Sequence, residues 1–207
     1  MIRFGIIGMG IRGKLYASTL MQNPYAVVAT VCDTNPQARR MAEEVYHARS
    51  YATYQELICA GGIDAVIVAT PDFLHHDIVL MAAQYGLHML IEKPFSTDTA
   101  QAEEMARAIT DAGVKCLVAF ENRWSLPFLQ AKELCAQDGL GPVLNVYAFL
   151  ADTYYVPTQM LPWAGKSTPA WFLFPHIIDM AGWLTGKTVQ KVYATGVKQK
   201  LAAAGID

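Results

Sequence analysis

The sequence has few residues of the kinds that mark secreted, metal-binding or membrane proteins. It contains four cysteines, Cys32, Cys59, Cys116 and Cys135. None of them stands in a C-x-x-C spacing, which argues against a metal site and predicts reduced, mostly buried thiols. There is no run of 18 apolar residues, and no charged segment followed by an apolar one precedes the first predicted strand. We therefore expect no membrane span and a cytoplasmic protein.

An excess of charge of one sign is also absent. The chain has 16 Lys and Arg against 18 Asp and Glu, a formal net charge of −2, and its basic residues are scattered. This excludes the basic stripe of a nucleic-acid-binding protein and the polybasic patch of a membrane-surface protein. The hydrophobic content of 53% is high for 207 residues, and parallel strands buried on both faces would account for part of it.

Short apolar runs alternate with helical stretches from residue 1 to about residue 120. Strands are predicted at 2–7, 26–32, 65–69, 88–91 and 116–120, and helices at about 14–21, 36–46, 54–59, 74–85 and 98–112. Such alternation is typical of βαβ units in a doubly wound parallel sheet. Asn35 is placed to cap one of these helices and either Thr97 or Asp98 to cap another, and Gly86 and Gly113 are placed to end two. The fold class predicted for this part is α/β.

The remainder of the chain has a different pattern. It predicts a helix at 126–137, a strand at 142–151, a long irregular loop at 153–169, an aromatic-rich helix at 170–184 and a second strand at 189–197. We expect an α/β domain over residues 1–122 and a partial α+β domain over 123–207. Two strands are too few to cover a helix well, so we expect either that the protein is a fragment of a longer one or that a second copy of the chain covers the apolar face of this sheet.

The most informative segment is Gly8-Met9-Gly10-Ile11-Arg12-Gly13, which directly follows the first apolar strand. A strand that runs into G-x-G-x-x-G and then a helix is the turn that holds the pyrophosphate of a dinucleotide. Gly8 permits the tight turn, Gly10 lets the backbone approach the phosphates, and Gly13 lets the helix pack on its strand. The helix N-terminus then faces the anion.

Asp33 ends the second predicted strand, 20 residues after Gly13. This is the separation expected for the carboxylate that binds the adenosine ribose, and a carboxylate repels a 2′-phosphate. The sequence therefore predicts NAD rather than NADP as the cofactor, with Thr34 next to Asp33 in the same site. Arg39 and Arg40 are interpreted as part of a solvated helix face.

Three more clusters follow predicted secondary structure at positions suited to a site. Thr70 and Pro71 break a strand, and His75 stands in the first turn of the next helix; alone, such a histidine is more often a surface or capping group. Glu92-Lys93-Pro94 closes another strand, at the edge where such sheets bind ligands. A lysine in that position can transfer protons, although an isolated surface lysine beside a turn would look the same.

The third cluster is an aromatic stretch, residues 171–179, that contains His176 and Asp179 three residues apart on one helix face. Spacing alone favours a histidine that is hydrogen-bonded in a core. Together, however, the ordered segments GMGIRG, VCDTNP, ATPDFLHH, HMLIEKPFS, AFENRW and H-x-x-D resemble the Gfo/Idh/MocA family of glucose-fructose oxidoreductases and inositol dehydrogenases. The resemblance is continuous over residues 1–123 and looser as far as residue 184.

The resemblance implies a Rossmann domain followed by an α+β domain that covers the active site and forms oligomers through its sheet. It implies Lys93 and His176 as catalytic residues, with Asp179 in the last position of the family's histidine motif and a candidate substrate contact. Apart from the resemblance, Arg123 and Trp163 are candidate linings of the substrate pocket, although Trp163 could equally be a packing residue. The cofactor contacts expected from motif and resemblance together are Gly8, Gly10, Ile11, Arg12, Gly13, Asp33, Thr34, Thr70, Pro71, His75, Glu92, Lys93 and Asn122. Family members are longer, beyond about 300 residues, which would make the second domain truncated.

One departure bears on function, because Phe172 stands where the family has an aspartate. The sequence predicts an NAD-dependent oxidoreductase that acts on a secondary alcohol of a sugar, cyclitol or related polyol. A dinucleotide-binding regulator or catalytically impaired relative is one alternative, and cofactor-assisted elimination or glycoside cleavage is another. Net production of reduced cofactor would separate the first function from both alternatives.

Overall fold

The computed structural model describes residues 1–137 and 141–206 of the chain. It divides the chain into two compact units, Met1–Ala119 (unit 1) and Phe120–Asp207 (unit 2), each of which is considered by itself below. No helix in the described ranges is long and apolar enough to cross a membrane.

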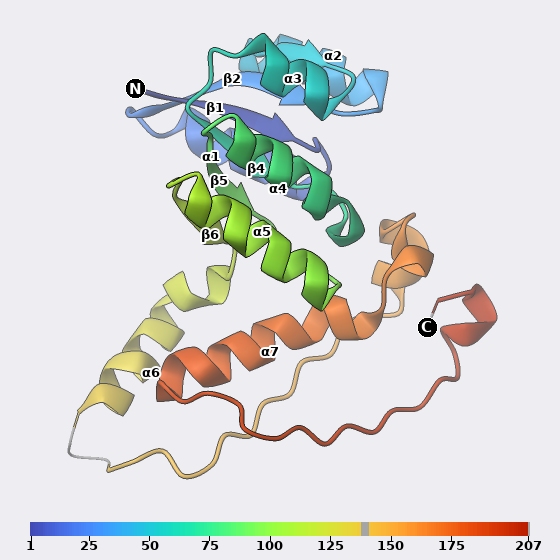
Figure 1. The fold of residues 1–207 in the computed structure, drawn as a ribbon. Helices are drawn as coiled ribbons and strands as arrows, with labels where there is room; N and C mark the ends of the chain where they lie inside the picture. The colour runs from blue at the N-terminus through green and yellow to red at the C-terminus, as the bar shows by residue number, and fades with distance from the viewer. Residues whose placement is uncertain (138–140, 207) are drawn as a thin grey trace. The chain divides into compact units, whose positions relative to one another are not determined.

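Unit 1 is a six-stranded parallel sheet with helices packed on both faces (Figure 1). The strands are β1 (Ile2–Ile7), β2 (Ala26–Cys32), β3 (Arg49–Tyr51), β4 (Ala65–Val68), β5 (His88–Ile91) and β6 (Cys116–Val118). The helices are α1 (Ile11–Met21), α2 (Pro36–Tyr46), α3 (Tyr54–Ala60), the 3₁₀ turn η1 (Asp72–Leu74), α4 (His75–Gln84) and α5 (Thr99–Asp111). The predicted α/β class and the five predicted strands of this unit are confirmed.

The strand order is β3-β2-β1-β4-β5-β6. The order reverses between β1 and β4, and a doubly wound sheet binds its ligand in the crevice at the carboxyl ends of such strands. One hydrophobic cluster packs α3, α4 and α5 on one face of the sheet, and a second packs α1 and α2 on the other. β4 is buried along its whole length, as expected for a parallel strand covered on both sides.

Local chemistry sets the ends of the helices in unit 1. Asn35 and Asp98 cap α2 and α5, because their side chains accept the backbone N–H of Gln37 and Gln101. Gly86 and Gly113 follow α4 and α5 with φ of 67° and 64°, a conformation that glycine adopts at little cost. β3 was not predicted, since a three-residue strand with two polar residues carries no periodic signal.

Unit 2 is helical in the described residues. It contains η2 (Glu121–Trp124), α6 (Leu126–Ala136), the π-helical turn η4 (Val156–Met160), η5 (Ala164–Lys166), α7 (Pro169–Thr185) and η6 (Ala202–Ala204). The predicted helices at 126–137 and 170–184 are confirmed by α6 and α7. The segment 153–169, predicted as an irregular loop, instead contains the two short turns η4 and η5.

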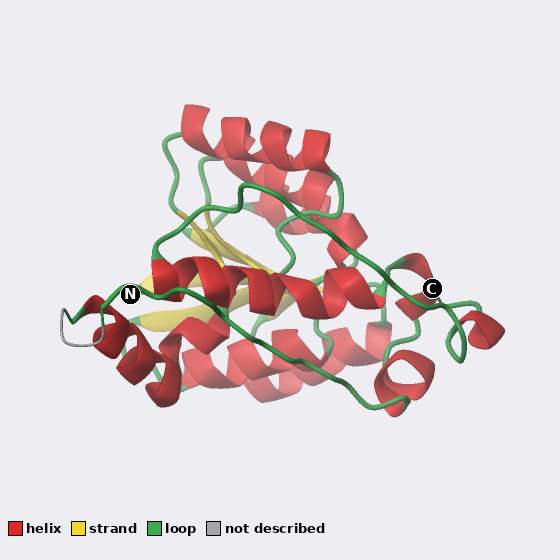
Figure 2. Ribbon diagram, turned by 90° about the horizontal axis from the view of Figure 1, so that it is seen from below, coloured by secondary structure: helices red, strands yellow, loops and turns green. Residues whose placement is uncertain are grey.

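The two strands predicted in the second half of the chain are wrong as assigned. Residues 142–151 and 189–197 are drawn as loop in Figure 2, and every strand in the described ranges belongs to unit 1. A strand is stable only where its backbone pairs with another strand, and neither segment is paired here. Both leave apolar side chains exposed, with Leu144 90% and Tyr193 93% accessible.

The cysteines are free, as predicted, but the expectation that most are buried is wrong. Cys32 is buried in β2, Cys116 and Cys135 are half-buried, and Cys59 is exposed on the last turn of α3. Free cysteine is more often buried than exposed, but this general preference does not place a single cysteine, and a helix surface can accommodate one.

Candidate functional site

The glycine turn lies at the carboxyl end of β1, beside the end of β4, where the strand order reverses. Gly8 has φ of 95°, and a Cβ on it would lie 2.6 Å from the carbonyl oxygen of Ala69. A Cβ on Gly13 would lie 1.9 Å from the carbonyl oxygen of Gly8, whereas one on Gly10 would meet nothing within 4 Å. Gly8 and Gly13 are therefore required by the fold, while Gly10 borders open space at the N-cap of α1, where a phosphate group fits.

Asp33 closes this turn from the end of β2. Its Oδ2 accepts the backbone N–H of Met9 at 2.7 Å, and its Oδ1 accepts that of Asn35 at 2.8 Å. A carboxylate offers about four acceptor positions, so these two bonds leave capacity for two hydroxyl donors. Thr34, next in the chain, is exposed.

Arg39 is not part of a solvated face, and that prediction is wrong. Its guanidinium reaches back along α2 and donates from Nη1 to the carbonyl oxygens of Asp33 and Thr34, at 2.7 and 3.1 Å. The side chain is half-buried, whereas Arg40 is exposed as predicted. The sequence pattern did not predict this contact, because Arg39 and Asp33 are six residues apart. The side chain reaches the carbonyl oxygens only because the chain turns into α2 at Pro36. A cation thus borders the ribose end of the site.

Thr70 and Pro71 follow β4, directly beside Gly8. The Thr70 hydroxyl is buried, and it has no hydrogen-bond partner within the described residues. Buried hydroxyls are seldom left unpaired, so this group is suited to a ligand at the turn. A dinucleotide would find three matching features at this sheet edge, namely the space at Gly10, the spare acceptor positions of Asp33 and the Thr70 hydroxyl.

His75 is almost completely buried, at 1% accessible. Its ring nitrogens lie 3.1 Å from the carbonyl oxygen of Pro94 and 3.2 Å from that of Thr70, so the ring joins the loops that follow β4 and β5. Burial lowers its pKa, against the opposing effect of those carbonyls and of Asp72. The structure gives His75 a supporting position beneath both loops, and direct contact with a cofactor stays a prediction.

The Glu92-Lys93-Pro94 segment leaves β5 at the same edge of the sheet. Glu92 is buried, and its Oε1 accepts hydrogen bonds from Nε of Arg12 at 2.5 Å and from the hydroxyl of Tyr16 at 2.6 Å. Its Oε2 accepts the backbone N–H of Lys93 at 3.1 Å. Lys93 is half-buried. Tyr16 was not predicted; the signal was its position four residues after Arg12, on the same face of α1.

In unit 2, η2 and α7 bring four predicted residues together. Arg123 donates hydrogen bonds from both Nε and Nη2 to the carboxylate of Asp179, and the bond from Nε measures 2.8 Å. Asn122 Nδ2 lies 3.5 Å from Nδ1 of His176. The hydrogen-bonded carboxylate of Asp179 raises the pKa of Arg123. Arg123 and Asp179 thus bind each other and link η2 to α7, and their contact with a substrate stays a prediction.

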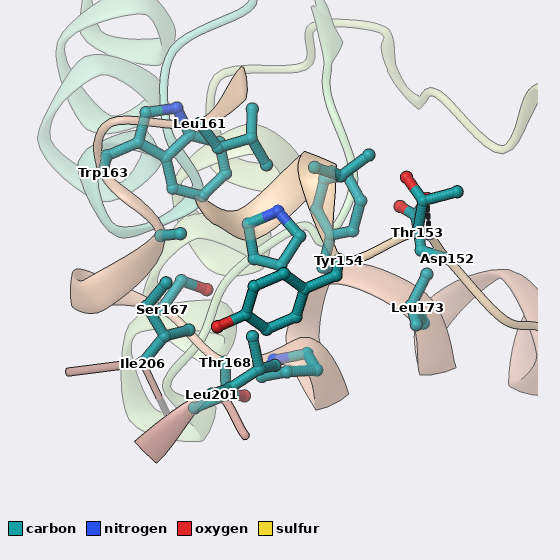
Figure 3. Close-up of a pocket in the computed structure, with 15 residues that line it drawn as sticks. Asp152, Thr153, Tyr154, Leu161, Trp163, Ser167, Thr168, Leu173, Leu201 and Ile206 are labelled. Atoms are coloured by element: carbon teal, nitrogen blue, oxygen red, sulfur yellow. Dashed lines mark hydrogen bonds between the residues drawn. The ribbon is translucent and has the colours of Figure 1, made fainter. Parts of the chain in front are cut away.

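Trp163 and Phe172 lie in a different part of unit 2, around an apolar cavity of about 240 Å³ (Figure 3). Tyr154 and Leu173 also line it. Phe172 therefore packs among apolar groups at the position where an aspartate was expected, and it brings no acid or base to α7. In the described residues, no three His, Cys, Asp or Glu side chains cluster in a way that could hold a metal ion.

Comparison with known proteins places this geometry in a family. Residues 2–120 match the Gfo/Idh/MocA oxidoreductases, described as an oxidoreductase family with an NAD-binding Rossmann fold. Inositol 2-dehydrogenase of Rhizobium meliloti is 27% identical over 194 residues, which cover 94% of this chain and 58% of that protein. The NADP-dependent scyllo-inositol 2-dehydrogenase IolW of Bacillus subtilis is 28% identical, covering 100% of this chain and 58% of that protein.

A solved structure agrees in fold. The scyllo-inositol dehydrogenase of Lactobacillus casei with bound NAD(H) and scyllo-inositol superposes with a TM-score of 0.88 at 23% identity, covering 96% of this chain and 60% of that one. The chain spans about 58% of the length of these two curated relatives. The predicted family is confirmed: the chain belongs to the Gfo/Idh/MocA oxidoreductases, whose Rossmann fold binds NAD.

Proposed function

We propose that the protein is an NAD-dependent dehydrogenase that oxidises a secondary alcohol of a sugar, cyclitol or related polyol. The observation that carries this proposal is that the open Gly10 turn and the half-buried Lys93 follow parallel strands at the same sheet edge of unit 1, where Arg12 and Glu92 join the two segments. The relatives named above are inositol dehydrogenases, which supports the choice of substrate class.

The residues of unit 1 would hold the cofactor along this edge. The N-terminus of α1 and the space at Gly10 receive the pyrophosphate, the spare acceptor positions of Asp33 receive two ribose hydroxyls, and Thr70 contributes its hydroxyl. When bound, the dinucleotide supplies the hydride-transfer chemistry. The protein's own task is then to orient the substrate and to handle one proton.

Lys93 is the group we assign to that proton. A neutral amine at this edge would accept the proton of the substrate hydroxyl as the alcohol becomes a carbonyl, and it would return the proton in the reverse direction. We propose His176 as the second proton-handling group, with Asn122, whose Nδ2 lies 3.5 Å from its Nδ1, as the residue that would orient its ring. We propose Arg123 and Asp179 as substrate contacts at one place in unit 2, and Trp163 as a further contact at the apolar cavity.

The preference for NAD over NADP is a separate part of the proposal. The Asp33 carboxylate repels a 2′-phosphate, which favours NAD. Arg39 places a cation next to Asp33 and weakens that repulsion. We therefore propose that NAD binds more tightly and that NADP is still accepted, since the relatives include an NADP-dependent enzyme.

A second candidate function is a dinucleotide-binding regulator or a catalytically impaired relative. The observation that favours it is Phe172, which occupies an apolar wall and cannot assist a proton transfer. A cofactor-assisted elimination, which returns the cofactor unchanged, remains the other enzymatic alternative.

We further propose a cytoplasmic enzyme that forms homo-oligomers through the apolar segments 142–151 and 189–197.

The test is turnover of a panel of inositols, hexoses and pentoses with NAD, followed through the absorbance of reduced nicotinamide. Accumulation of reduced cofactor with at least one polyol is the expected result. Consumption of substrate without reduced cofactor would support elimination, and tight NAD binding without any turnover would support the regulator.

A further inference from the structure

We propose that Tyr16 is a positioning residue for Lys93, acting through the buried carboxylate of Glu92. The inference rests on the proposed function in that it takes Lys93 as the proton-handling group. It assigns a role in the reaction to a residue on α1, a helix whose expected task was only to bind the cofactor's phosphates.

Glu92 is held by hydrogen bonds to both of its carboxylate oxygens. A buried carboxylate is costly unless hydrogen bonds replace the lost water. Oε1 of Glu92 receives two charged or polar donors from α1, Arg12 at 2.5 Å and Tyr16 at 2.6 Å, and Oε2 receives the Lys93 amide at 3.1 Å. The carboxylate therefore joins α1 to the backbone of Lys93, and each oxygen faces one of the two.

The two donors on α1 are themselves held in place by each other. Arg12 and Tyr16 are one helical turn apart, the Arg12 guanidinium lies 5.3 Å from the centre of the Tyr16 ring, and its Nη2 donates to the Tyr16 hydroxyl at 3.2 Å. That bond occupies the hydroxyl's acceptor side, so its one hydrogen points to Glu92. Burial and the adjacent carboxylate raise the pKa of Tyr16, and the phenol stays a donor throughout the neutral range.

Loss of the bond from Tyr16 to Glu92 would leave the carboxylate less firmly held. A Tyr16→Phe substitution keeps the ring and its packing but leaves Oε1 with Arg12 alone. Hydrogen bonds to charged groups contribute enough that losing one changes a rate by on the order of 10-fold when the bond holds a reacting group in place. Arg12 also borders the predicted phosphate site, so Tyr16 is the cleaner probe.

The experiment compares Tyr16→Phe with Tyr46→Phe in the full chain. Tyr46 is a matched control. Like the Tyr16 hydroxyl, which bonds Arg12, its hydroxyl lies within hydrogen-bond distance of a side chain of α1, Ser18 at 3.3 Å, but it does not contact Glu92. We expect Tyr16→Phe to lower kcat on the order of 10-fold and the melting temperature by several degrees, because the buried carboxylate loses a donor, while the Kd for NAD stays within error of wild type and the protein stays folded at the assay temperature. Tyr46→Phe should leave kcat and the Kd for NAD unchanged. A fraction of unfolded protein at the assay temperature that accounts for the lost rate would overturn the proposal.

A double-mutant comparison tests the route through Glu92. In a Glu92→Gln background, Tyr16→Phe should cause less than a twofold further loss of kcat, because the residue it acts through has already changed. Full additivity of the two substitutions would contradict the proposal.

A readout without turnover separates this inference from the proposed function. Lysines can be labelled by reductive ¹³C-methylation, and the Lys93 signal identified by its loss in Lys93→Arg. We expect Tyr16→Phe, and not Tyr46→Phe, to shift that signal. An unchanged signal refutes the positioning role even if the enzyme is active. If no polyol is oxidised, the proposed function fails while the shift still supports the positioning role.

Discussion

Gly10 and Gly13 give a paired test of the cofactor site, because the two positions differ in what a side chain would meet. At Gly10 an added Cβ has nothing within 4 Å, whereas at Gly13 it would lie 1.9 Å from the carbonyl oxygen of Gly8. The first substitution should therefore affect only a ligand, and the second the turn itself.

The magnitudes follow from these contacts. Gly10→Val costs the N-cap preference for glycine, about 1 kcal/mol or less. Gly13→Ala forces a backbone carbonyl aside, at about 1–3 kcal/mol as for other overpacked sites. With a melting shift of about 3–6 °C per kcal/mol for a unit of this size, Gly13→Ala should melt roughly 5–15 °C below wild type. Gly10→Val should melt within about 5 °C of it.

The assay is thermal unfolding with and without NAD. At a ligand concentration of about 100 Kd, binding stabilises the native state by about 2.7 kcal/mol, a rise of roughly 10 °C for wild type. Gly10→Val should show no rise, because its side chain occupies the space of the phosphate. A Gly10→Val protein that NAD stabilises as much as wild type would refute the site. A Gly13→Ala protein as stable as wild type would refute the packing argument.

Three further predictions follow from the same geometry. Asp33→Ser should bring the Kd for NADP to or below that for NAD, because Arg39 remains beside the ribose without the opposing carboxylate; calorimetry of both cofactors measures this, and an unchanged preference for NAD would contradict it. Lys93→Ala should lower kcat by about 10²- to 10⁴-fold with little change in NAD affinity, and His176→Ala by less if it only orients substrate; rates retained in both variants would exclude this chemistry. Burial lowers the pKa of His75 from its ordinary 6.5, so the unfolded chain binds a proton that the folded chain excludes, and stability should fall as the pH drops below about 6.5. Urea unfolding at several pH values should show this fall in stability in wild type. An equal fall in His75→Gln would show that His75 is not its cause.

The parts of the fold that could be predicted from the sequence are those encoded locally. The glycine turn, Asp33 and the caps at Asn35 and Asp98 depend on residues close in the chain, and the structure places them as expected. The long apolar runs of a parallel sheet carry a similar local signal. β3 carries none, because its three residues are mostly polar and its pairing with β2 alone makes it a strand.

The remaining differences come from contacts between distant residues. Tyr16 meets Glu92 across 76 positions of the chain, and Arg39 reaches Asp33 only through the direction of α2. Segments 142–151 and 189–197 are rich in valine, tyrosine and other residues that favour strands, but such a composition gives a strand only the propensity to pair. No local pattern supplies the partner. The same reasoning applies to Phe172, whose apolar surroundings in unit 2 are contributed by segments 152–169 and 201–206.

The central claim is that the protein moves a hydride from a polyol carbon to a nicotinamide. The most direct test incubates the protein with NAD and an inositol that carries deuterium on its ring carbons, and then analyses the dinucleotide by mass spectrometry. We predict reduced cofactor that contains one deuterium, in an amount equal to the ketone formed. Dinucleotide that stays oxidised and unlabelled across a panel of deuterated polyols, although it binds at the glycine turn, would contradict the claim.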